Sequence, residues 1–368
     1  MSSDFGKNLK VSIFGQSHSE MIGALLDGLP SGYPIDPGEL QAFMDRRRAK
    51  DGLSTARREA DRVRIVSGLF EGKTCGAPLA ALIENENVRS SDYDEIAFHP
   101  RPSHADYTSF VKYRFRDYRG GGHFSGRLTA AMCAAGGVAK QILKTRGIFV
   151  GAHVLQIGKA KDTPFDPVRV KKEDFPDSDF PDSDFPALSP SAAEQMKAEI
   201  LTAKSECDSV GGIVECAVLG VPAGVGEPMF GGVENALAAN LFGIPAVKGV
   251  EFGSGFAGAC LRGSENNDAF YAEDGKIFTK TNNAGGSNGG ISNGMPVIFR
   301  VAIKPTASVF LPQETVDLKT GENYSLLIRG RHDPCIAVRA VPVAESVAAL
   351  TVLDLLLGAE KDKWNLGE

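Results

Sequence analysis

The chain of 368 residues has six cysteines but no pair at C-x-x-C spacing, so neither a zinc ribbon nor a dithiol redox motif is indicated. We expect free thiols in a reducing compartment. The first residues include no apolar segment typical of a secretory signal. The most apolar stretch, residues 341–358, contains Glu345 and Asp354, so no membrane span is expected. Together these absences predict a cytoplasmic protein.

An excess of positive charge is also missing, since the formal net charge is −6. Nucleic-acid and anionic-membrane binders are usually basic, so neither partner is expected. A metal site is not expected, because His332, Asp333 and Cys335 are one cluster of possible ligands and no second cluster has ligand spacing. No long linker divides the sequence, which predicts a single domain over residues 1–368.

Local patterns predict the first elements. Residues 10–14 alternate as in a strand, and the Asp-Pro at 36–37 is typical of a helix start. The apolar stripe that includes Leu40 and Met44 continues to Arg47, so this arginine is expected to point inward.

The clearest helix is predicted over residues 125–145, where apolar residues recur at spacings of four and three. Two consecutive glycines, 136–137, are a weak point inside it. A last helix is predicted over residues 342–357, with Gly358 at its end. Residues 162–190 break the pattern with a tandem Asp-Phe-Pro-Asp-Ser repeat, which is typical of an exposed loop.

Several residue groups could carry chemistry. Four histidines lie in polar turns, where a side chain that titrates near neutrality suits acid–base work, although a lone loop histidine is usually structural: His18, His104, His123 and His332. The arginines of residues 46–64 suit a small polyanion, or are solvated charges near a helix end. The glycines of 120–122 and 285–294 could hold a phosphate, or serve only as turn residues.

Two other motifs are misleading. Residues 253–258 satisfy G-x-G-x-x-G, but Gly263 follows too soon for the helix that a dinucleotide site requires. Residues 15–19 nearly match the turn of a serine hydrolase nucleophile, but Ser19 replaces its last glycine. Neither a Rossmann site nor a serine hydrolase is favoured.

Three segments together resemble the chorismate synthase family. They are Gly-Gln-Ser-His at 15–18, Arg-Pro-Ser-His-Ala-Asp-Tyr-Thr at 101–108 with Arg-Gly-Gly-Gly at 119–122, and Gly-Arg-His-Asp-Pro-Cys at 330–335. Residues 67–74 and 304–306 also match, in family order. The resemblance covers nearly the whole chain except 162–190.

The resemblance implies an α+β fold, a β-α-β sandwich with long helices between two antiparallel sheets, assembled as a homotetramer. It implies reduced FMN as cofactor, with NADPH as at most an indirect reductant and an external flavin reductase as partner. The implied reaction is the trans-1,4-elimination of phosphate from a small phosphorylated substrate, 5-enolpyruvylshikimate 3-phosphate. The product is chorismate, and the step leads to aromatic amino acids without net redox change.

The resemblance also assigns residues to the site. The catalytic set is His18, His104, Asp333, Ser17 and Ser125. The groups that hold substrate phosphate and carboxylates are Arg47, Arg101, Arg127 and Arg331, with Arg47 also assigned to NADP-associated contacts. FMN is expected to touch Ser125, Ala246, Gly289, Lys304, Pro305, Thr306, Ala307, Ser308 and Arg331.

Some positions depart from the family pattern. His123 and Phe124 stand where the family often has other residues, and we expect them to face the flavin or its phosphate. Pro245 replaces a usual asparagine. A non-catalytic flavin- or anion-binding homologue is the alternative, and retention of His18 and His104 argues against it.

Overall fold

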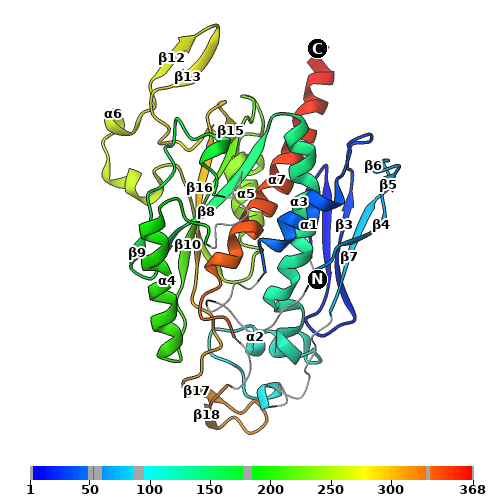
Figure 1. Ribbon diagram of the computed structural model, residues 1–368, viewed down its shortest axis with the longest axis vertical. Coiled ribbons are helices and arrows are strands. Elements are labelled where there is room, and N and C mark those ends of the chain that lie inside the picture. The colour runs from blue at the N-terminus through cyan, green and yellow to red at the C-terminus, as the bar shows by residue number, and fades with distance from the viewer. Residues whose placement is uncertain are drawn as a thin grey trace.

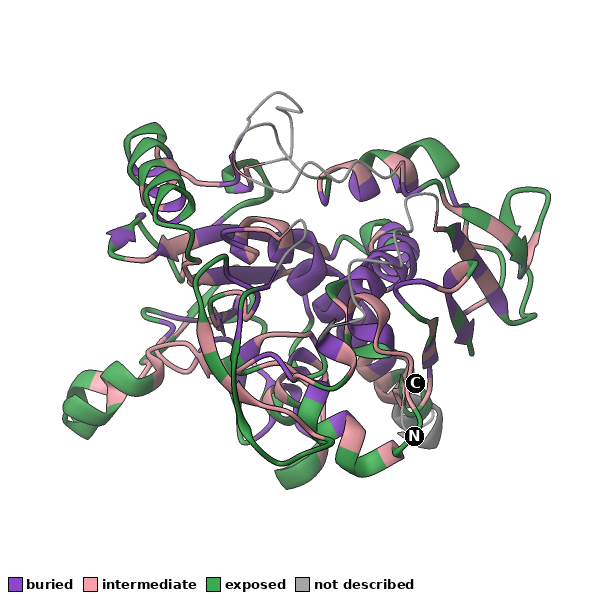
Figure 2. Ribbon diagram, turned by 90° about the horizontal axis from the view of Figure 1, so that it is seen from below, coloured by how far each residue is buried: buried purple, intermediate pink, exposed green. Residues whose placement is uncertain are grey.

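The computed structural model describes residues 3–48, 53, 60–85, 95–176, 185–328 and 332–366. Two five-stranded antiparallel sheets enclose a layer of helices (Figure 1). Within this layer α3 (Thr129–Thr145) packs on the first sheet and α7 (Ala337–Leu366) on the second, and the two helices pack on each other. Figure 2 shows that buried residues concentrate in this layer and on the sheet faces toward it. The predicted fold class is confirmed.

The first sheet comes from the N-terminal part of the chain and has the strand order β1-β2-β3-β7-β4. Alternate side chains of its central strand, Ile22, Ala24 and Leu26, are fully buried toward the helices. The strands are β1 (Asp4–Phe5), β2 (Lys10–Gly15), β3 (Met21–Asp27), β7 (Leu79–Glu84) and β4 (Arg64–Ser67).

The second sheet has the order β11-β16-β10-β8-β9. Its strands are β11 (Val247–Phe252), β16 (Val297–Ile303), β10 (Gly212–Leu219), β8 (Phe149–Ile157) and β9 (Ala160–Lys161). Four small hairpins pair β5 (Leu69–Phe70) with β6 (Lys73–Thr74), β12 (Phe270–Glu273) with β13 (Lys276–Thr279), β14 (Ser287–Asn288) with β15 (Ile291–Ser292), and β17 (Gln313–Val316) with β18 (Asn323–Leu326).

The other α-helices are α1 (Pro37–Asp45), α2 (Asp106–Tyr113), α4 (Pro190–Ser205), α5 (Val233–Leu241) and α6 (Gly263–Asn266). The predicted start of α1 is confirmed, because Asp36 accepts hydrogen bonds from the backbone N–H groups of Gly38 and Glu39. The rejected dinucleotide motif forms a short 3₁₀ helix after β11, with no long helix following it.

The glycine pair in α3 permits close packing and is not a defect. A Cβ atom on Gly136 would overlap the backbone and side chain of Ser346 in α7, and one on Gly137 would lie 2.5 Å from Leu40 Cδ1 in α1. The two glycines therefore lower the intrinsic helix propensity of α3 but let it pack closely against both α7 and α1.

The predicted bounds of the last helix are wrong at both ends. Helix α7 begins five residues before Pro342 and continues through Gly358. Gly358 is a point of close approach, since its Cβ would lie 2.9 Å from Asn8 Nδ2. Among the described residues this helix alone is long and apolar enough to span a membrane, over Ala337–Lys361, and 78% of its apolar window is buried inside the protein.

The described part of residues 162–190 has little regular structure and many exposed residues, as expected of an exposed loop, but several of its side chains are buried. Phe165 and Phe175 are buried and pack edge to face, with ring centroids 5.7 Å apart. Gly151 of β8 leaves room for the Phe175 ring, because a Cβ there would overlap it. Asp162 accepts a hydrogen bond from the N–H of Leu188, which ties the two ends of the segment together. Residues 177–184, which include the end of the first repeat and all of the second, lie outside the described residues.

This packing predicts different outcomes for two changes in the repeat. Phe175→Ala is expected to destabilise the protein by about 3 kcal/mol, because it removes a buried aromatic side chain. Deletion of residues 174–178 leaves Glu173 followed by an identical Asp-Phe-Pro-Asp-Ser unit, so a phenylalanine returns to the same place in the sequence. Thermal unfolding should show a clear fall in Tm for the substitution and little change for the deletion. Equal Tm values for Phe175→Ala and wild type would refute the proposed packing role.

Candidate active site

Many of the predicted site residues lie where the N-terminal ends of α3 and α7 approach the segment that carries α2 (Figure 1). His104 lies in the turn before α2 and is partly buried. Its Nδ1 lies 2.9 Å from Asp106 Oδ1, and Asp106 is only 1% exposed. Arg101 binds the same carboxylate through Nε at 2.7 Å, and its Nη1 donates to Ser308 Oγ at 3.2 Å. One buried carboxylate therefore orients both a histidine and an arginine.

The charges around His104 act in opposite directions. Burial lowers its pKa most strongly, the hydrogen bond to Asp106 raises it, and Arg101 and Lys304 lower it, so the pKa lies below its usual value. Burial would raise the pKa of Asp106, but its bonds to His104 and Arg101 prevail and hold that pKa far below the ordinary value. Asp106 is therefore ionised at neutral pH and stabilises the protonated form of His104.

The turn of glycines at 120–122 lies between the two histidines assigned to catalysis. A Cβ on Gly120 would lie 2.5 Å from His18 Cε1 and 2.6 Å from Ser17 Oγ, and one on Gly121 would lie 3.2 Å from His104 Nε2. The buried Ser17 donates its N–H to the Gly122 carbonyl at 3.0 Å. The turn thus connects the end of β2 with the segment before α2.

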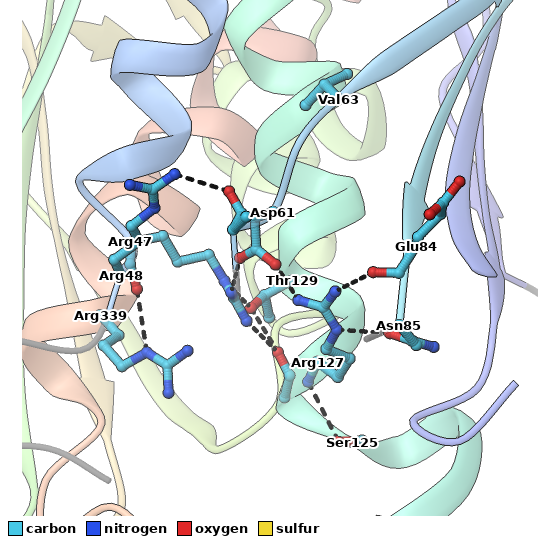
Figure 3. Close-up of polar contacts among 12 residues, drawn as sticks. Arg47, Arg48, Asp61, Val63, Glu84, Asn85, Ser125, Arg127, Thr129 and Arg339 are labelled. Atoms are coloured by element: carbon cyan, nitrogen blue, oxygen red, sulfur yellow. Dashed lines mark hydrogen bonds and ion pairs between the residues drawn. The ribbon is translucent and has the colours of Figure 1, made fainter. Parts of the chain in front are cut away.

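A second cluster joins two predicted substrate arginines through Asp61 (Figure 3). Arg47 and Arg127 are both buried, which confirms that Arg47 points inward. Asp61 Oδ2 accepts from Arg47 Nη1 at 2.9 Å, and Oδ1 pairs with Arg127 Nη1. Arg127 Nε also donates to Asn85 Oδ1 at 2.8 Å.

The segment after β16 adds further polar groups near His104. Lys304 Nζ donates to the carbonyl of Ser103, the residue before His104, and its backbone N–H donates to the Ala246 carbonyl at 3.0 Å. Burial, then Lys248, lowers the pKa of Lys304. Thr306 follows, and among the described residues its buried Oγ1 has no hydrogen-bond partner. Pro305 and Ala307 complete this segment.

Three other predicted residues sit at the edge of this arrangement. Ser125 accepts a hydrogen bond from the N–H of Arg127 and caps the short 3₁₀ turn before α3. Asp333 Oδ2 accepts from Arg339 Nη1 at 2.7 Å. His332 lies with its ring 5.7 Å from that of Phe310.

The remaining predicted residues are placed differently. His123 is exposed, with Nδ1 2.8 Å from the Gly15 carbonyl and Nε2 2.8 Å from Ser3 Oγ. Phe124 is partly exposed beside Tyr113. Gly289 lies in the β14–β15 turn near the start of β16, whereas Lys304 follows the end of that strand, so a single chain does not bring these two together. Arg331 lies outside the described residues.

Sequence reasoning assigned no role to three residues that organise the site. Asp106 stands two positions after His104 inside a quoted motif, so its spacing could have suggested a partnership. Asp61 and Asn85 are both far in sequence from Arg127, which binds them, and no local pattern marks them. In the part of the chain that the structure describes, no group of three His, Cys, Asp or Glu could hold a metal ion. All six cysteines are free thiols, as predicted.

Comparison with known proteins gives the family. The sequence model of chorismate synthase matches residues 9–357. The chain belongs to the chorismate synthase family. It is 46% identical to the chorismate synthase of Korarchaeum cryptofilum over 357 residues, which are 96% of this chain and 97% of that protein.

Two further members of the chorismate synthase family extend the match. The chorismate synthase of Methanosarcina mazei is 46% identical over 356 residues, or 96% of this chain and 95% of that protein. A solved structure described as a crystal structure of chorismate synthase superimposes with a TM-score of 0.75 at 29% identity, covering 96% of this chain and 93% of the other. The resemblance inferred from three motifs is confirmed, and the range of the family match, residues 9–357, spans residues 162–190.

Proposed function

We propose that the protein is a lyase that eliminates phosphate from 5-enolpyruvylshikimate 3-phosphate and forms chorismate. The observation that supports this most directly is the pairing of His104 and Arg101 on the single carboxylate of Asp106. A leaving phosphate requires cations and a proton donor in a site with little water. Arg101 is the cation and His104 the proton donor of this pair.

The orientation of the His104 ring follows from its neighbours, since Nδ1 lies 2.9 Å from Asp106 Oδ1 and 3.0 Å from Arg101 Nη2. Because Nδ1 faces Asp106, Nε2 is the ring nitrogen on the side of Gly121. Protonated His104 donates from Nε2 toward the leaving oxygen, while Asp106 stabilises the positive ring. The pKa of His104 lies below its usual value, mainly because of burial, which makes the protonated ring a stronger acid.

The residues present fit a bound flavin. The buried hydroxyl oxygens of Ser17 and Thr306 have no partner among the described residues, and the glycine backbone at 120 and 121 lies directly against Ser17, His18 and His104. Ser17, Ser125, Ala246 and the segment Lys304 to Ser308 would hold reduced FMN, which supplies electron density transiently when bound. His18 would polarise the flavin from the other side of the glycine turn. Asp333 would act with Ser17 and Ser125 on the substrate proton.

We also propose a cytoplasmic homotetramer. Large apolar side chains are strongly exposed on 3₁₀ turns and on the β12–β13 hairpin, which projects from the body in Figure 1: Met229, Phe230, Phe256, Phe270 and Ile277. Exposed apolar groups of this size favour burial between subunits. Because no flavin-reductase motif is visible in the sequence, an external reductase would supply the reduced flavin, with NADPH only as an indirect reductant.

The reaction is tested by anaerobic assay of the purified protein with dithionite-reduced FMN and the enolpyruvyl substrate. Chorismate should form only with reduced flavin, and no flavin should be consumed per product. Equal turnover with oxidised FMN in air would contradict the proposal. FMN binding without any turnover would instead support the non-catalytic homologue.

A further inference from the structure

Asp61 lies between two arginines in Figure 3 and is only 5% exposed. Its Oδ2 accepts from Arg47 Nη1 at 2.9 Å and its Oδ1 pairs with Arg127 Nη1. Each oxygen of one carboxylate thus holds one guanidinium and keeps two like charges together. Charge-assisted hydrogen bonds of this kind are strong and directional.

The other nitrogens of both arginines are fixed as well. Arg47 Nε donates to Thr129 Oγ1 at 2.9 Å and its Nη2 donates to the Gly126 carbonyl at 3.0 Å. Arg127 Nε donates to Asn85 Oδ1 at 2.8 Å. A planar guanidinium held at three nitrogens cannot rotate freely, so the orientation of each cation is set by the protein.

The backbone of Asp61 is in the left-handed region, with φ of 44°. This conformation is unfavourable for a residue with a Cβ, although aspartate tolerates it better than most. Such a conformation persists only where the surroundings hold it, and it is common at functional sites. The chain therefore accepts strain in order to place this carboxylate between the two arginines.

Counted over its five described residues, the cluster carries one more positive than negative charge. Its cations are Arg47, Arg127 and Arg339, and its anions are Asp61 and Asp333. Arg339 connects Arg47 with Asp333, because it donates to the carbonyl of the first and the carboxylate of the second. Burial, then Arg339, lowers the pKa of Arg47 to about 10. Burial would raise the pKa of Asp61, but Arg47 and Arg127 prevail and lower it. A buried cluster with surplus positive charge is stabilised by an anion.

The same network reaches the turn that carries His18. Asn85, which accepts from Arg127, donates its Nδ2 to the carbonyls of Gln16 and Ser19, at 3.1 and 2.7 Å. Asp61 is thus linked through Arg127 and Asn85 to this turn. A shift of Asp61 would therefore move both an anion-binding group and its catalytic neighbours.

We propose that Asp61 is a positioning residue, which holds Arg47 and Arg127 in the orientation in which they bind the phosphate or carboxylates of the substrate. The inference rests on the proposed function, because that function supplies the anionic substrate. It gives Asp61 a role that differs from neutralising charge. If Asp61 only neutralised charge, its removal would strengthen anion binding, whereas loss of positioning weakens it.

The test compares Asp61→Asn, Asp61→Glu and a matched control, Glu345→Gln. Glu345 is also a fully buried acid bound to two cations, Arg46 at 2.6 Å and Lys140, but we assign it no role in the site. Steady-state kinetics with reduced FMN give KM and kcat, calorimetric titration gives the affinity for inorganic phosphate, and thermal unfolding gives Tm.

Asp61→Asn is expected to raise the KM for substrate and the Kd for phosphate by roughly tenfold or more, as for loss of a charge-assisted hydrogen bond. Its kcat should change less, and Asp61→Glu should recover part of the affinity. Glu345→Gln should lower Tm but keep both constants within about twofold of wild type, since the buried ion pairs that it removes, to Arg46 and Lys140, include none of the predicted site residues. If Asp61→Asn does not fold, Asp61→Glu provides the test instead, and it is expected to bind phosphate more weakly than wild type.

Unchanged or tighter phosphate binding by a folded Asp61 variant would overturn the inference, and so would an equal loss in Glu345→Gln. A wild type that binds phosphate but forms no chorismate would refute the proposed function alone. In that case a weaker phosphate affinity of Asp61→Asn would still support the positioning role.

Discussion

Replacement of His104 by alanine is expected to lower kcat by about 10²–10⁴, the range for a general acid–base group. The ring has a buried carboxylate at Nδ1, and its Nε2 lies on the side of the glycine turn. Alanine removes the proton donor and leaves Arg101 with its partners Asp106 and Ser308. Anaerobic steady-state kinetics at saturating substrate and reduced FMN measure the effect.

The control is His99→Ala, five residues earlier in the chain. His99 also lies beside a carboxylate, 3.6 Å from Asp317, and its ring stacks on Tyr324. We assign it no catalytic role, so its kcat should stay within a few-fold of wild type. Full activity of a folded His104→Ala variant would remove His104 from the mechanism.

The pH profile gives a second measure of the same histidine. Asp106 raises the pKa of His104, while burial, Arg101 and Lys304 lower it. An acid must be protonated to act, so kcat should fall as pH rises through the pKa of His104. In Asp106→Asn the raising contribution is lost, and this fall should move to lower pH. Loss of folding alone would not shift the profile.

The sequence was sufficient where structure depends on local chemistry. The start of α1 follows from the side chain of Asp36 and the fixed backbone of Pro37, and α3 follows from its apolar period. The overall fold came from the resemblance of three motifs, since no local pattern specifies two sheets around a helical layer. The same motifs implied that Arg101, His104 and Lys304 lie close together, and they do so in the structure.

The errors come from contacts between distant residues. Pro342 and Gly358 are ordinary signals of helix ends, yet α7 continues past both because it is packed between the second sheet and α3. Phe175 belongs to a polar, proline-rich repeat, but Gly151, distant in sequence, leaves the space that buries it. Asp61 has no motif of its own, and its role depends on two arginines that only the fold places beside it.

The second large effect is expected from Gly120→Ala, which should lower kcat by roughly 10², the cost of misplacing a catalytic group by about 1 Å. Gly120 has φ of 58°, a conformation that L side chains rarely adopt. Its added Cβ would lie 2.5 Å from His18 Cε1 and 2.6 Å from Ser17 Oγ. The methyl group must therefore displace the His18 ring, the Ser17 side chain or the turn itself.

Gly147→Ala is the matched control, because Gly147 also has a positive φ, 72°, but an added Cβ there meets nothing within 4 Å. Its kcat should equal that of wild type.

FMN affinity then separates the two roles that the glycine turn could have. If its backbone N–H groups only held a phosphate, Gly120→Ala would weaken FMN binding and leave kcat at saturating FMN unchanged. If the turn sets the position of His18, kcat falls even when FMN is saturating, and this is the outcome that the short distances to His18 and Ser17 predict.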